Sequence, residues 1–384
     1  MKLFITAGEP SGDALGAALI AGLKELVPDL ELRGIAGPRM QAAGIESLFP
    51  MEELSVMGLA EVLPKYFALK RRIAQTAEAC VDWAPDALIT IDSPDFSLRV
   101  ARLVRDRAPS LRTMHYVAPT VWAWRPERAA KMAPIIDHVL ALFPFEPPYM
   151  TAAGMTCDFV GHPVATVPPV TEDEKAAFRA EHGLSGPLLV LLPGSRKSEV
   201  ARLMPVLAEA LRQSPQATWD VVLPTLPHLS DAIREMARDL PKPPVIIDGK
   251  GRGAEAGADA RRVAMATADL ALAASGTVSL ELAAARTPMV IIHDMNWISR
   301  VIISRKILID TVTLVNLVSE TRTIPEFLGR DCRPELIAPA LAALGERTAD
   351  QLSAMDLTME RLGQGAEPPG LRAARSVLAH LEAK

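Results

Sequence analysis

Residues 270–281 combine a turn of small residues with a carboxylate one helical turn later. An apolar run ends at Ser275, Gly276 and Thr277, and Glu281 follows in a predicted helix. The first backbone N–H groups of a helix have no intrahelical acceptor and carry partial positive charge, so a phosphate can bind there. Glu281 can accept hydrogen bonds from the hydroxyls of a ribose. The stretch indicates a nucleotide site, although a capped turn between a strand and a helix is the commoner meaning of such a string.

A second turn of this kind follows the apolar run 188–192. Gly194 and Ser195 open another predicted helix, and Arg196 adds a guanidinium group beside it. A guanidinium makes paired hydrogen bonds to phosphate, which adds to the attraction of the helix start. Two candidate phosphate sites in one half of the chain support each other.

Two carboxylates follow the buried run 87–91. Asp92 comes directly after the run, and Asp95 stands where the next helix is expected to begin. Ligands of parallel α/β sheets gather outside the carboxyl ends of the strands, so Asp92 or Asp95 can supply a general base. Either can instead cap the helix that follows, and Asp95 is the better placed for capping.

Three polar residues lie in a glycine-rich loop after the first apolar run, residues 2–7. They are Glu9, Ser11 and Asp13. The loop is not the G-x-G-x-x-G dinucleotide fingerprint, and its two carboxylates would repel a pyrophosphate. We interpret it as a loop that faces a sugar or an acceptor, and a capped turn with Asp13 near the helix start explains it equally well.

Two tryptophans, Trp122 and Trp124, flank an alanine just before Arg125. Such a pair can form a wall for a sugar or an acyl chain. Tryptophan is also a common interior residue, so packing inside the domain is the alternative interpretation.

The segment 62–73 interleaves basic residues with aliphatic and aromatic ones. An interfacial helix needs this composition, because apolar burial and attraction to anionic lipid add together. The candidate membrane contacts are Leu63, Lys65, Tyr66, Phe67, Leu69, Lys70, Arg71 and Ile73. Residues 297–308 form a second segment of this type. A helix that packs on the core and solvates its basic face is the usual meaning of such a pattern.

Length and composition favour a two-domain protein outside the nucleic-acid-binding class. The chain has 384 residues, 49% of them hydrophobic, a formal charge of −5 and three widely spaced cysteines. This length suggests two domains, and the negative charge offers no general attraction to nucleic acid. The cysteines fit a reducing cytoplasm and no zinc site. We find no signal-peptide pattern and no run of about 18 apolar residues, so we expect any lipid contact to be peripheral.

The combination of motifs resembles one family, the lipid-A-disaccharide synthases. The shared strings keep one order along most of the chain: residues 8–13, 37–40, 51–58, 92–96, 122–124, 159–163, 192–196 with 199–200, 275–277 with 281, and 316–317. A match of this extent is far more specific than any single motif.

The resemblance implies an α/β fold of the GT-B type, with two Rossmann-like domains whose parallel sheets face an interdomain cleft. Residues 1–165 would bind the acceptor and contact the membrane, and 166–345 would bind UDP. Residues 346–384 would form helices that pack back on the N-terminal domain. The linker falls in the Pro- and Glu-rich stretch 163–173.

The resemblance also implies an inverting glycosyltransferase of lipid A (lipopolysaccharide) biosynthesis. Its substrates would be UDP-2,3-diacylglucosamine and 2,3-diacylglucosamine 1-phosphate, with Asp92 as the base that deprotonates the acceptor 6-hydroxyl. Arg196 and the two turns would hold the diphosphate, Glu281 the ribose, and Asn316 would face the acceptor or sugar. No metal would be needed, because no D-x-D string stands where it could hold a metal–diphosphate. Such enzymes act in the cytoplasm at the surface of the inner membrane.

Two other functions remain open from the sequence. A GT-B UDP-sugar epimerase would share the nucleotide half, and a non-catalytic peripheral membrane protein could use a nucleotide as a switch. Oligomeric state, acyl-chain length selectivity and domain closure are not predictable from these patterns.

Overall fold

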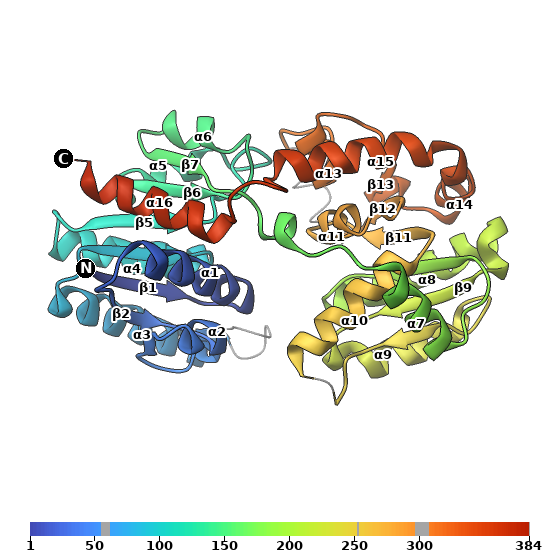
Figure 1. The fold of residues 1–384 in the computed structure, drawn as a ribbon, viewed down its shortest axis with the longest axis horizontal. Helices are drawn as coiled ribbons and strands as arrows, with labels where there is room; N and C mark the ends of the chain where they lie inside the picture. Colours follow the sequence, from blue (N-terminus) through green and yellow to red (C-terminus); the bar gives the residue numbers. More distant parts are fainter. Residues whose placement is uncertain (55–61, 252, 296–306, 384) are drawn as a thin grey trace. The chain divides into compact units, whose positions relative to one another are not determined.

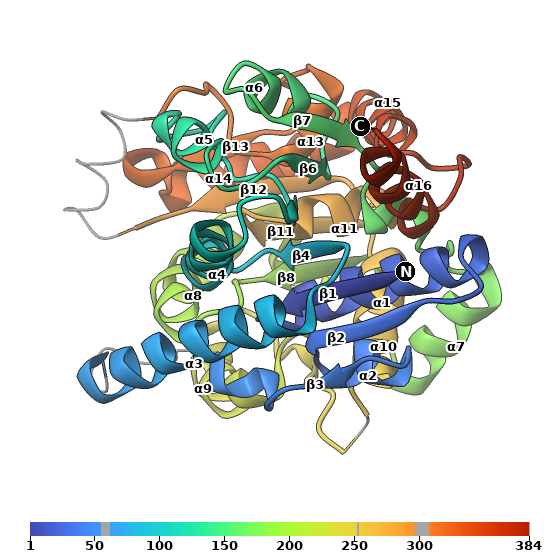
Figure 2. The ribbon, with the colours of Figure 1, turned by 90° about the vertical axis from the view of Figure 1, so that its left-hand side faces the viewer.

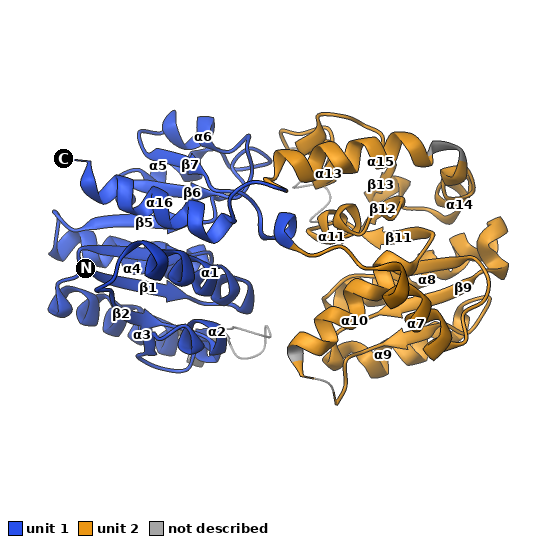
Figure 3. Ribbon diagram, viewed as in Figure 1, with its two compact units in different colours: residues 1–166, 365–384 blue, residues 167–364 orange. Residues whose placement is uncertain are grey.

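The computed structural model describes residues 1–54, 62–251, 253–295 and 307–383 (Figure 1). The chain forms two compact units: Met1–Thr166 with Gly365–Lys384, and Val167–Gln364 (Figure 3). Each unit is built on one parallel sheet with helices packed on it, so the predicted fold class of two Rossmann-like α/β domains is confirmed. No helix in the described ranges has the length and apolar character that crossing a bilayer requires.

The first unit contains a seven-stranded parallel sheet in the order β3-β2-β1-β4-β5-β6-β7. Its central strands β1, β4 and β5 are almost fully buried because helices cover both faces of a parallel sheet. All five residues of β4 are buried. The strands are β1 (Lys2–Ala7), β2 (Glu31–Ile35), β3 (Glu46–Ser47), β4 (Ala87–Ile91), β5 (Arg112–Tyr116), β6 (His138–Ala141) and β7 (Thr156–Phe159).

Several helices of the first unit begin with a proline, whose fixed φ suits the first turn of a helix. The helices are α1 (Pro10–Leu26), α2 (Pro38–Ala42), α3 (Val62–Trp83), α4 (Pro94–Arg107), α5 (Glu127–Met132), α6 (Pro147–Thr151) and α16 (Pro369–Glu382). The last helix, α16, packs on α1 near the start of the chain. Glycine permits this contact: a Cβ on Gly370 would lie about 2.4 Å from the carbonyl oxygen of Ala18.

The second unit repeats this plan with a six-stranded parallel sheet in the order β10-β9-β8-β11-β12-β13. Its strands are β8 (Leu188–Leu192), β9 (Asp220–Pro224), β10 (Val245–Ile247), β11 (Leu270–Ala274), β12 (Met289–His293) and β13 (Glu326–Leu328). Its helices are α7 (Glu172–His182), α8 (Lys197–Arg212), α9 (Ser230–Met236), α10 (Ala254–Thr267), α11 (Val278–Ala284), α13 (Leu314–Ser319), α14 (Pro334–Ala342) and α15 (Leu344–Arg361).

The C-terminal helices divide between the units, which differs from the sequence-based boundary at residue 346. Helix α15 packs on α11, α13 and β12 in the second unit, and only α16 joins the first. The side chain of Gln351, fully buried on α15, donates to the carbonyl of Met289 at 3.1 Å and accepts from its N–H at 2.8 Å. This pairing with the first residue of β12 fixes α15 to the second sheet.

In each sheet the order in which successive strands are added reverses once, although all strands stay parallel. The reversal point lies between β1 and β4 in the first unit and between β8 and β11 in the second. At such a point the loops from two neighbouring strands leave the sheet in opposite directions. The space between them is where ligands of open α/β sheets bind.

Candidate active site

Asp92 leaves the carboxyl end of β4 at the reversal point of the first sheet. Asp92 and the next residue, Ser93, have left-handed backbones with φ of 49° and 44°. Non-glycine residues adopt this conformation at a cost, and such residues cluster at functional sites. The Asp92 N–H donates to the Tyr116 carbonyl at 2.9 Å, and its carbonyl accepts from the Ser97 hydroxyl at 2.7 Å. These bonds fix the backbone from which the carboxylate projects.

The carboxylate of Asp92 is half-buried, and no residue in the described ranges donates a hydrogen bond to it or forms an ion pair with it. A carboxylate without an internal partner keeps its lone pairs for a substrate hydroxyl. The geometry therefore suits Asp92 for the predicted role of general base.

The loop after β1 lies against the loop that carries Asp92. Ala7 pairs with Ile91 in the sheet, and a Cβ added to Gly8 would stand 2.7 Å from the Ser93 hydroxyl. Only glycine allows this approach. Glu9 and Ser11 follow at the start of α1 and are exposed. Two of the three candidates in this loop thus lie on the loop next to Asp92.

Asp13 has a structural role instead of the sugar-facing one that the sequence suggested. Its side chain is 3% exposed, and its two oxygens accept from the N–H groups of Arg39 at 2.9 Å and Met40 at 3.0 Å. Asp13 thereby caps the start of α2, which leaves no oxygen directed at solvent. A Cβ on Gly37 would stand 2.6 Å from this carboxylate. The capped-turn alternative is the one that the structure supports.

Asp95 lies in the first turn of α4 and is exposed. Its negative charge stabilises the positive end of the helix dipole, and its side chain caps no N–H. Among the described residues Asp95 therefore does not cap α4, as the alternative interpretation had it, although its charge is favourable at the start of the helix.

Trp122 packs inside the first unit and does not form an open wall. It is 8% exposed, meets Phe145 edge-on at 5.1 Å, and donates its ring N–H to Glu146 at 3.3 Å. Trp124 is half-buried, with the guanidinium of Arg125 over its ring at 4.1 Å. Interior packing, the alternative interpretation, therefore holds for Trp122, and only Trp124 remains accessible.

The buried carboxyl of Glu146 was not recognised from the sequence. It is 2% exposed and accepts from the N–H groups of Leu142 at 3.1 Å and Phe143 at 3.0 Å as well as from Trp122. Burial raises the pKa of Glu146 to about 7. The sequence could have indicated it, because Glu146 is the only acidic residue in the otherwise apolar string 142–148. An acid buried in such surroundings needs hydrogen-bond donors, which are here the two N–H groups and the Trp122 ring.

The first candidate phosphate turn follows β8 in the second unit. Gly194 has a φ of 111°, and its position leaves no room for a side chain because the Glu199 carboxylate lies there. The Ser195 N–H donates to that carboxylate at 3.1 Å. The side chain of Arg196 is exposed, and its guanidinium has no hydrogen-bond or ion-pair partner within the described parts of the chain. Glu199 thus accepts from the Ser195 N–H, one of the groups predicted to bind phosphate, while the guanidinium of Arg196 is available.

The second candidate turn follows β11, the neighbour of β8 at the reversal point. Ala273 pairs with Leu192, so Ser275 to Thr277 leave the sheet beside Gly194. Gly276 has a φ of 143°, and a Cβ there would meet no atom within 4 Å. The turn is therefore open, as a ligand requires.

Glu281, the candidate ribose acceptor, pairs with a residue that the sequence did not single out. Arg261 on α10 lies 3.2 Å from its carboxylate, and both side chains are about one-third exposed. The Arg261 Nε is buried and has no partner among the described residues. Arg261 is therefore a further candidate for the nucleotide site.

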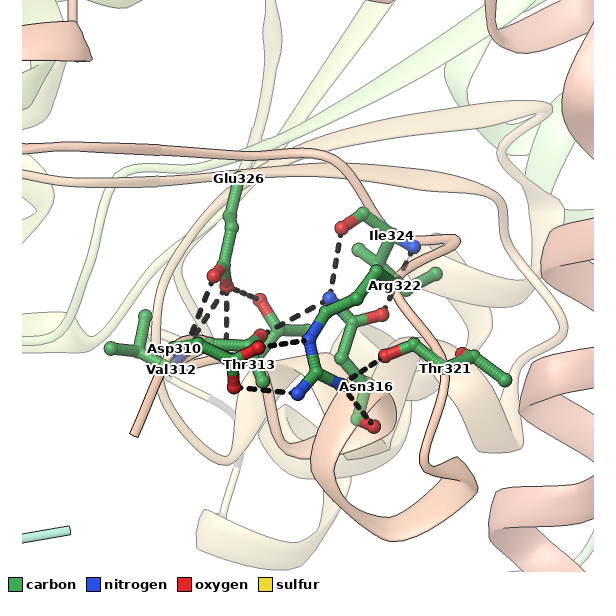
Figure 4. A network of polar contacts seen from close by, with 9 residues as sticks. Asp310, Val312, Thr313, Asn316, Thr321, Arg322, Ile324 and Glu326 are labelled. Carbon is green, nitrogen blue, oxygen red and sulfur yellow. Dashed lines mark hydrogen bonds and ion pairs between the residues drawn. The ribbon is translucent and has the colours of Figure 1, made fainter. Parts of the chain in front are cut away.

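Asn316 is structural and does not face a substrate. It is 1% exposed, and its amide donates to the Thr311 hydroxyl at 3.2 Å and the Ile324 carbonyl at 2.9 Å, while its oxygen accepts from the Ile324 N–H at 3.0 Å (Figure 4). The neighbouring Glu326 holds the N–H groups of Val312 and Thr313. The network closes the loop around α13, so the sequence-based role of Asn316 is wrong.

A model of the lipid-A-disaccharide synthetase family matches residues 3–372. The chain belongs to this family. It is 60% identical over 384 residues to the lipid-A-disaccharide synthase of Ruegeria pomeroyi, covering 99% of this chain and 96% of that protein. It is 43% identical to that of Rhodospirillum centenum, covering 98% and 94%. The resemblance inferred from the motifs is confirmed.

Solved structures share the fold of this family member at low sequence identity. UDP-GlcNAc 2-epimerase from Neisseria meningitidis, bound to UDP-GlcNAc, superimposes with a TM-score of 0.63 at 13% identity, covering 100% of both chains. Staphylococcus aureus MnaA with UDP gives 0.62 at 12% identity, covering 100% of this chain and 98% of the other. These likenesses establish the two-domain fold alone, and the family assignment does not favour the epimerase alternative.

Helix α3 carries the candidate membrane segment of this lipid-A-disaccharide synthetase family member. Phe67 is 67% exposed, Lys70 and Arg71 are exposed, and Leu69 is partly so. Ile73 is 4% exposed, so it belongs to the core and its predicted lipid contact is wrong. The side chains of Leu63, Lys65 and Tyr66 lie outside the described residues, as does nearly all of the second candidate segment 297–308.

Proposed function

We propose that the protein is an inverting glycosyltransferase that joins UDP-2,3-diacylglucosamine to 2,3-diacylglucosamine 1-phosphate. The products are the lipid A disaccharide 1-phosphate and UDP. Family membership over nearly the whole chain supports this reaction class. The observation that carries the mechanism is the carboxylate of Asp92, which stands at the reversal point of a Rossmann-like sheet without a hydrogen-bonding partner in the described chain.

In this mechanism Asp92 accepts the proton of the acceptor 6-hydroxyl as that oxygen attacks the anomeric carbon of the donor. The bond from the anomeric carbon to the UDP oxygen breaks on the opposite face, which inverts the configuration and gives a β-linkage. Negative charge then develops on the diphosphate. In this mechanism Arg196 and the N–H groups of the turn at 275–277, all in the second unit, stabilise this charge. The Ser195 N–H of the turn at 194–195 contributes only when the Glu199 carboxylate to which it donates moves away. Because these groups supply positive charge, we expect no metal requirement.

The deciding experiment follows UDP release by the purified protein from detergent-dispersed UDP-2,3-diacylglucosamine. The reaction is run with and without 2,3-diacylglucosamine 1-phosphate, and with EDTA or added Mg²⁺. We expect release that depends on the acceptor and is unaffected by EDTA. Release without acceptor would instead support an epimerase or a hydrolase, and dependence on Mg²⁺ would overturn the metal-independent mechanism.

We further propose that the enzyme works on the cytoplasmic surface of the inner membrane and that α3 contacts the lipid. Both substrates are acylated, and α3 presents Phe67 together with Lys70 and Arg71 to solvent. Aromatic burial and attraction to anionic lipid then act together.

Replacing Phe67 and Leu69 with Ser is expected to weaken binding to anionic liposomes by about tenfold or more, since each exposed side chain loses its apolar burial. The melting temperature should change little because neither residue is in the core. Liposome co-sedimentation measures the effect, with Leu336→Ser, at a residue 37% exposed in the second unit, as the control. Equal binding by all three proteins would exclude α3 as the contact.

A further inference from the structure

An apolar groove with a volume of about 440 Å³ opens on the first unit, between α5 and α6. Volumes of about 300–1,000 Å³ are typical of small-molecule sites. One wall comes from α5 and the loop before it, including Val121, Pro126 and Ala130. The other comes from α6 and the residues after it, including Pro148, Tyr149 and Ala152. Both helices lie beside β6 and β7 (Figure 2).

A hydrogen bond joins the two segments of the chain that carry the walls of the groove. Trp122, next to Val121 in one wall, donates to the buried carboxyl of Glu146, which stands two residues before Pro148 in the other. Glu146 is fixed in turn by two backbone N–H groups. A buried carboxyl is costly unless its hydrogen bonds are satisfied, and here they are. This hydrogen bond therefore fixes the segment before α5 to the segment before α6.

Two arginines adjoin lining residues in the chain, since Arg125 precedes Pro126 and Arg128 precedes Ala129. Arg125 and Arg128 place their guanidinium groups 4.1 and 5.5 Å from the ring centre of Trp124. Neither arginine forms an ion pair with a carboxylate in the parts of the chain that the structure describes. An apolar groove with two arginines next to its lining residues in the chain is complementary to an anionic amphiphile, whose chain and charged group need different surroundings.

The loop that carries one wall of the groove begins next to Asp92, the proposed catalytic base. The Asp92 N–H donates to Tyr116, the last residue of β5, and the loop 117–126 leads from there to the groove. In a parallel sheet the crossover helices begin at the carboxyl edge, so Pro126 and Pro148 mark the end of the groove on the side of Asp92. Ala152 lies farther along.

We propose that this groove holds an acyl chain of the acceptor, 2,3-diacylglucosamine 1-phosphate. The inference rests on the glycosyltransferase function proposed above and assigns the chain-binding site within it. The acceptor carries its phosphate and its acyl chains on one sugar, which matches the pairing of Arg125 and Arg128 with the apolar groove. The acceptor 6-hydroxyl then faces Asp92.

The test fills the groove from each wall with a large side chain. Ala130 and Ala152 are exposed, so Ala130→Trp and Ala152→Trp occupy the groove without disturbing the core. Ala42→Trp, at an exposed position of α2 that does not line the groove, is the matched control. Dissociation constants are measured without donor for acceptors with long and with short acyl chains, and UDP-release kinetics and melting temperatures are recorded alongside.

We expect each groove variant to bind the long-chain acceptor about tenfold or more weakly, because methylene groups lose their burial, and the short-chain acceptor almost normally. KM for the long-chain acceptor should rise in parallel, with UDP affinity unchanged. An equal loss for both chain lengths, or a loss shared by Ala42→Trp, would overturn the inference. So would an unchanged chain-length preference in a folded groove variant.

The two proposals fail in different ways. If the wild-type protein releases UDP on addition of acceptor while the groove variants keep its chain-length preference, the groove assignment alone is wrong. If the variants lose long-chain binding but the wild type never releases UDP with acceptor, the groove stands as an acyl-chain site and the glycosyltransferase function is wrong. Should Ala152→Trp lower the melting temperature, Ala130→Trp tests the same groove from the opposite wall.

Discussion

Replacement of Asp92 by Asn is expected to lower kcat by about 10²–10⁴-fold, the usual contribution of a general base. The amide keeps the shape of the side chain but cannot take the proton of the acceptor 6-hydroxyl. UDP affinity should stay within about twofold of the wild-type value, because the carboxylate is in the first unit and the UDP turns are in the second. Initial rates of UDP release, together with calorimetric titration of UDP, separate the two effects.

The matched control is Asp106→Asn, which removes an exposed carboxylate from the last turn of α4, the helix that follows Asp92. It should leave kcat unchanged. If Asp92→Asn retains near-normal turnover, another group is the base. Glu9 would then be the next residue to replace, since it is exposed on the loop beside Asp92.

Replacement of Arg196 by Ala is expected to weaken UDP binding by about 10- to 100-fold, the range for loss of a hydrogen bond to a charged group. The guanidinium is exposed at the start of α8 and has no partner in the described ranges, so its removal takes nothing from the folded state. Arg196→Lys should recover part of the affinity, because an ammonium keeps the charge but loses the paired hydrogen bonds.

Calorimetric titration with UDP measures this effect. Arg238→Ala, which removes an exposed arginine elsewhere in the second unit, is the control. An unchanged dissociation constant for Arg196→Ala would mean that the diphosphate does not bind at the start of α8. The remaining candidates for binding the diphosphate would then be the open turn at Gly276 and Arg261, whose Nε has no partner among the described residues.

The sequence predicts where strands end, and therefore where a site can be, better than it predicts which side chains are free. Asp92 and Ser275 both follow fully buried strands, and the structure places both at reversal points of their sheets. A buried strand must end where polar residues begin, so the end of a strand can be predicted from the residues next to it in the sequence.

The residues whose roles changed are those with partners far along the chain. Asp13 and Asn316 have side chains that serve equally well as ligands or as caps. Their N–H and carbonyl partners, on α2 and around Ile324, come together only in the fold. The link between Arg261 and Glu281 likewise joins two separate helices. Helical periodicity identified α3 but could not tell that Ile73 faces the core while Phe67 faces outward.

The position of α16 determines the order in which the two units can complete their folding during synthesis on the ribosome. Gly22 of α1 lies against this helix, and a Cβ there would stand 2.7 Å from the carbonyl oxygen of Gly370. Domains usually fold as units while synthesis proceeds from the N-terminus. Because α16 follows the whole second unit in the chain, the second unit is synthesised while the first still lacks this helix. The face of α1 beneath α16 is therefore open to chaperones, or to a neighbouring nascent chain, until α16 has been synthesised and has packed on it.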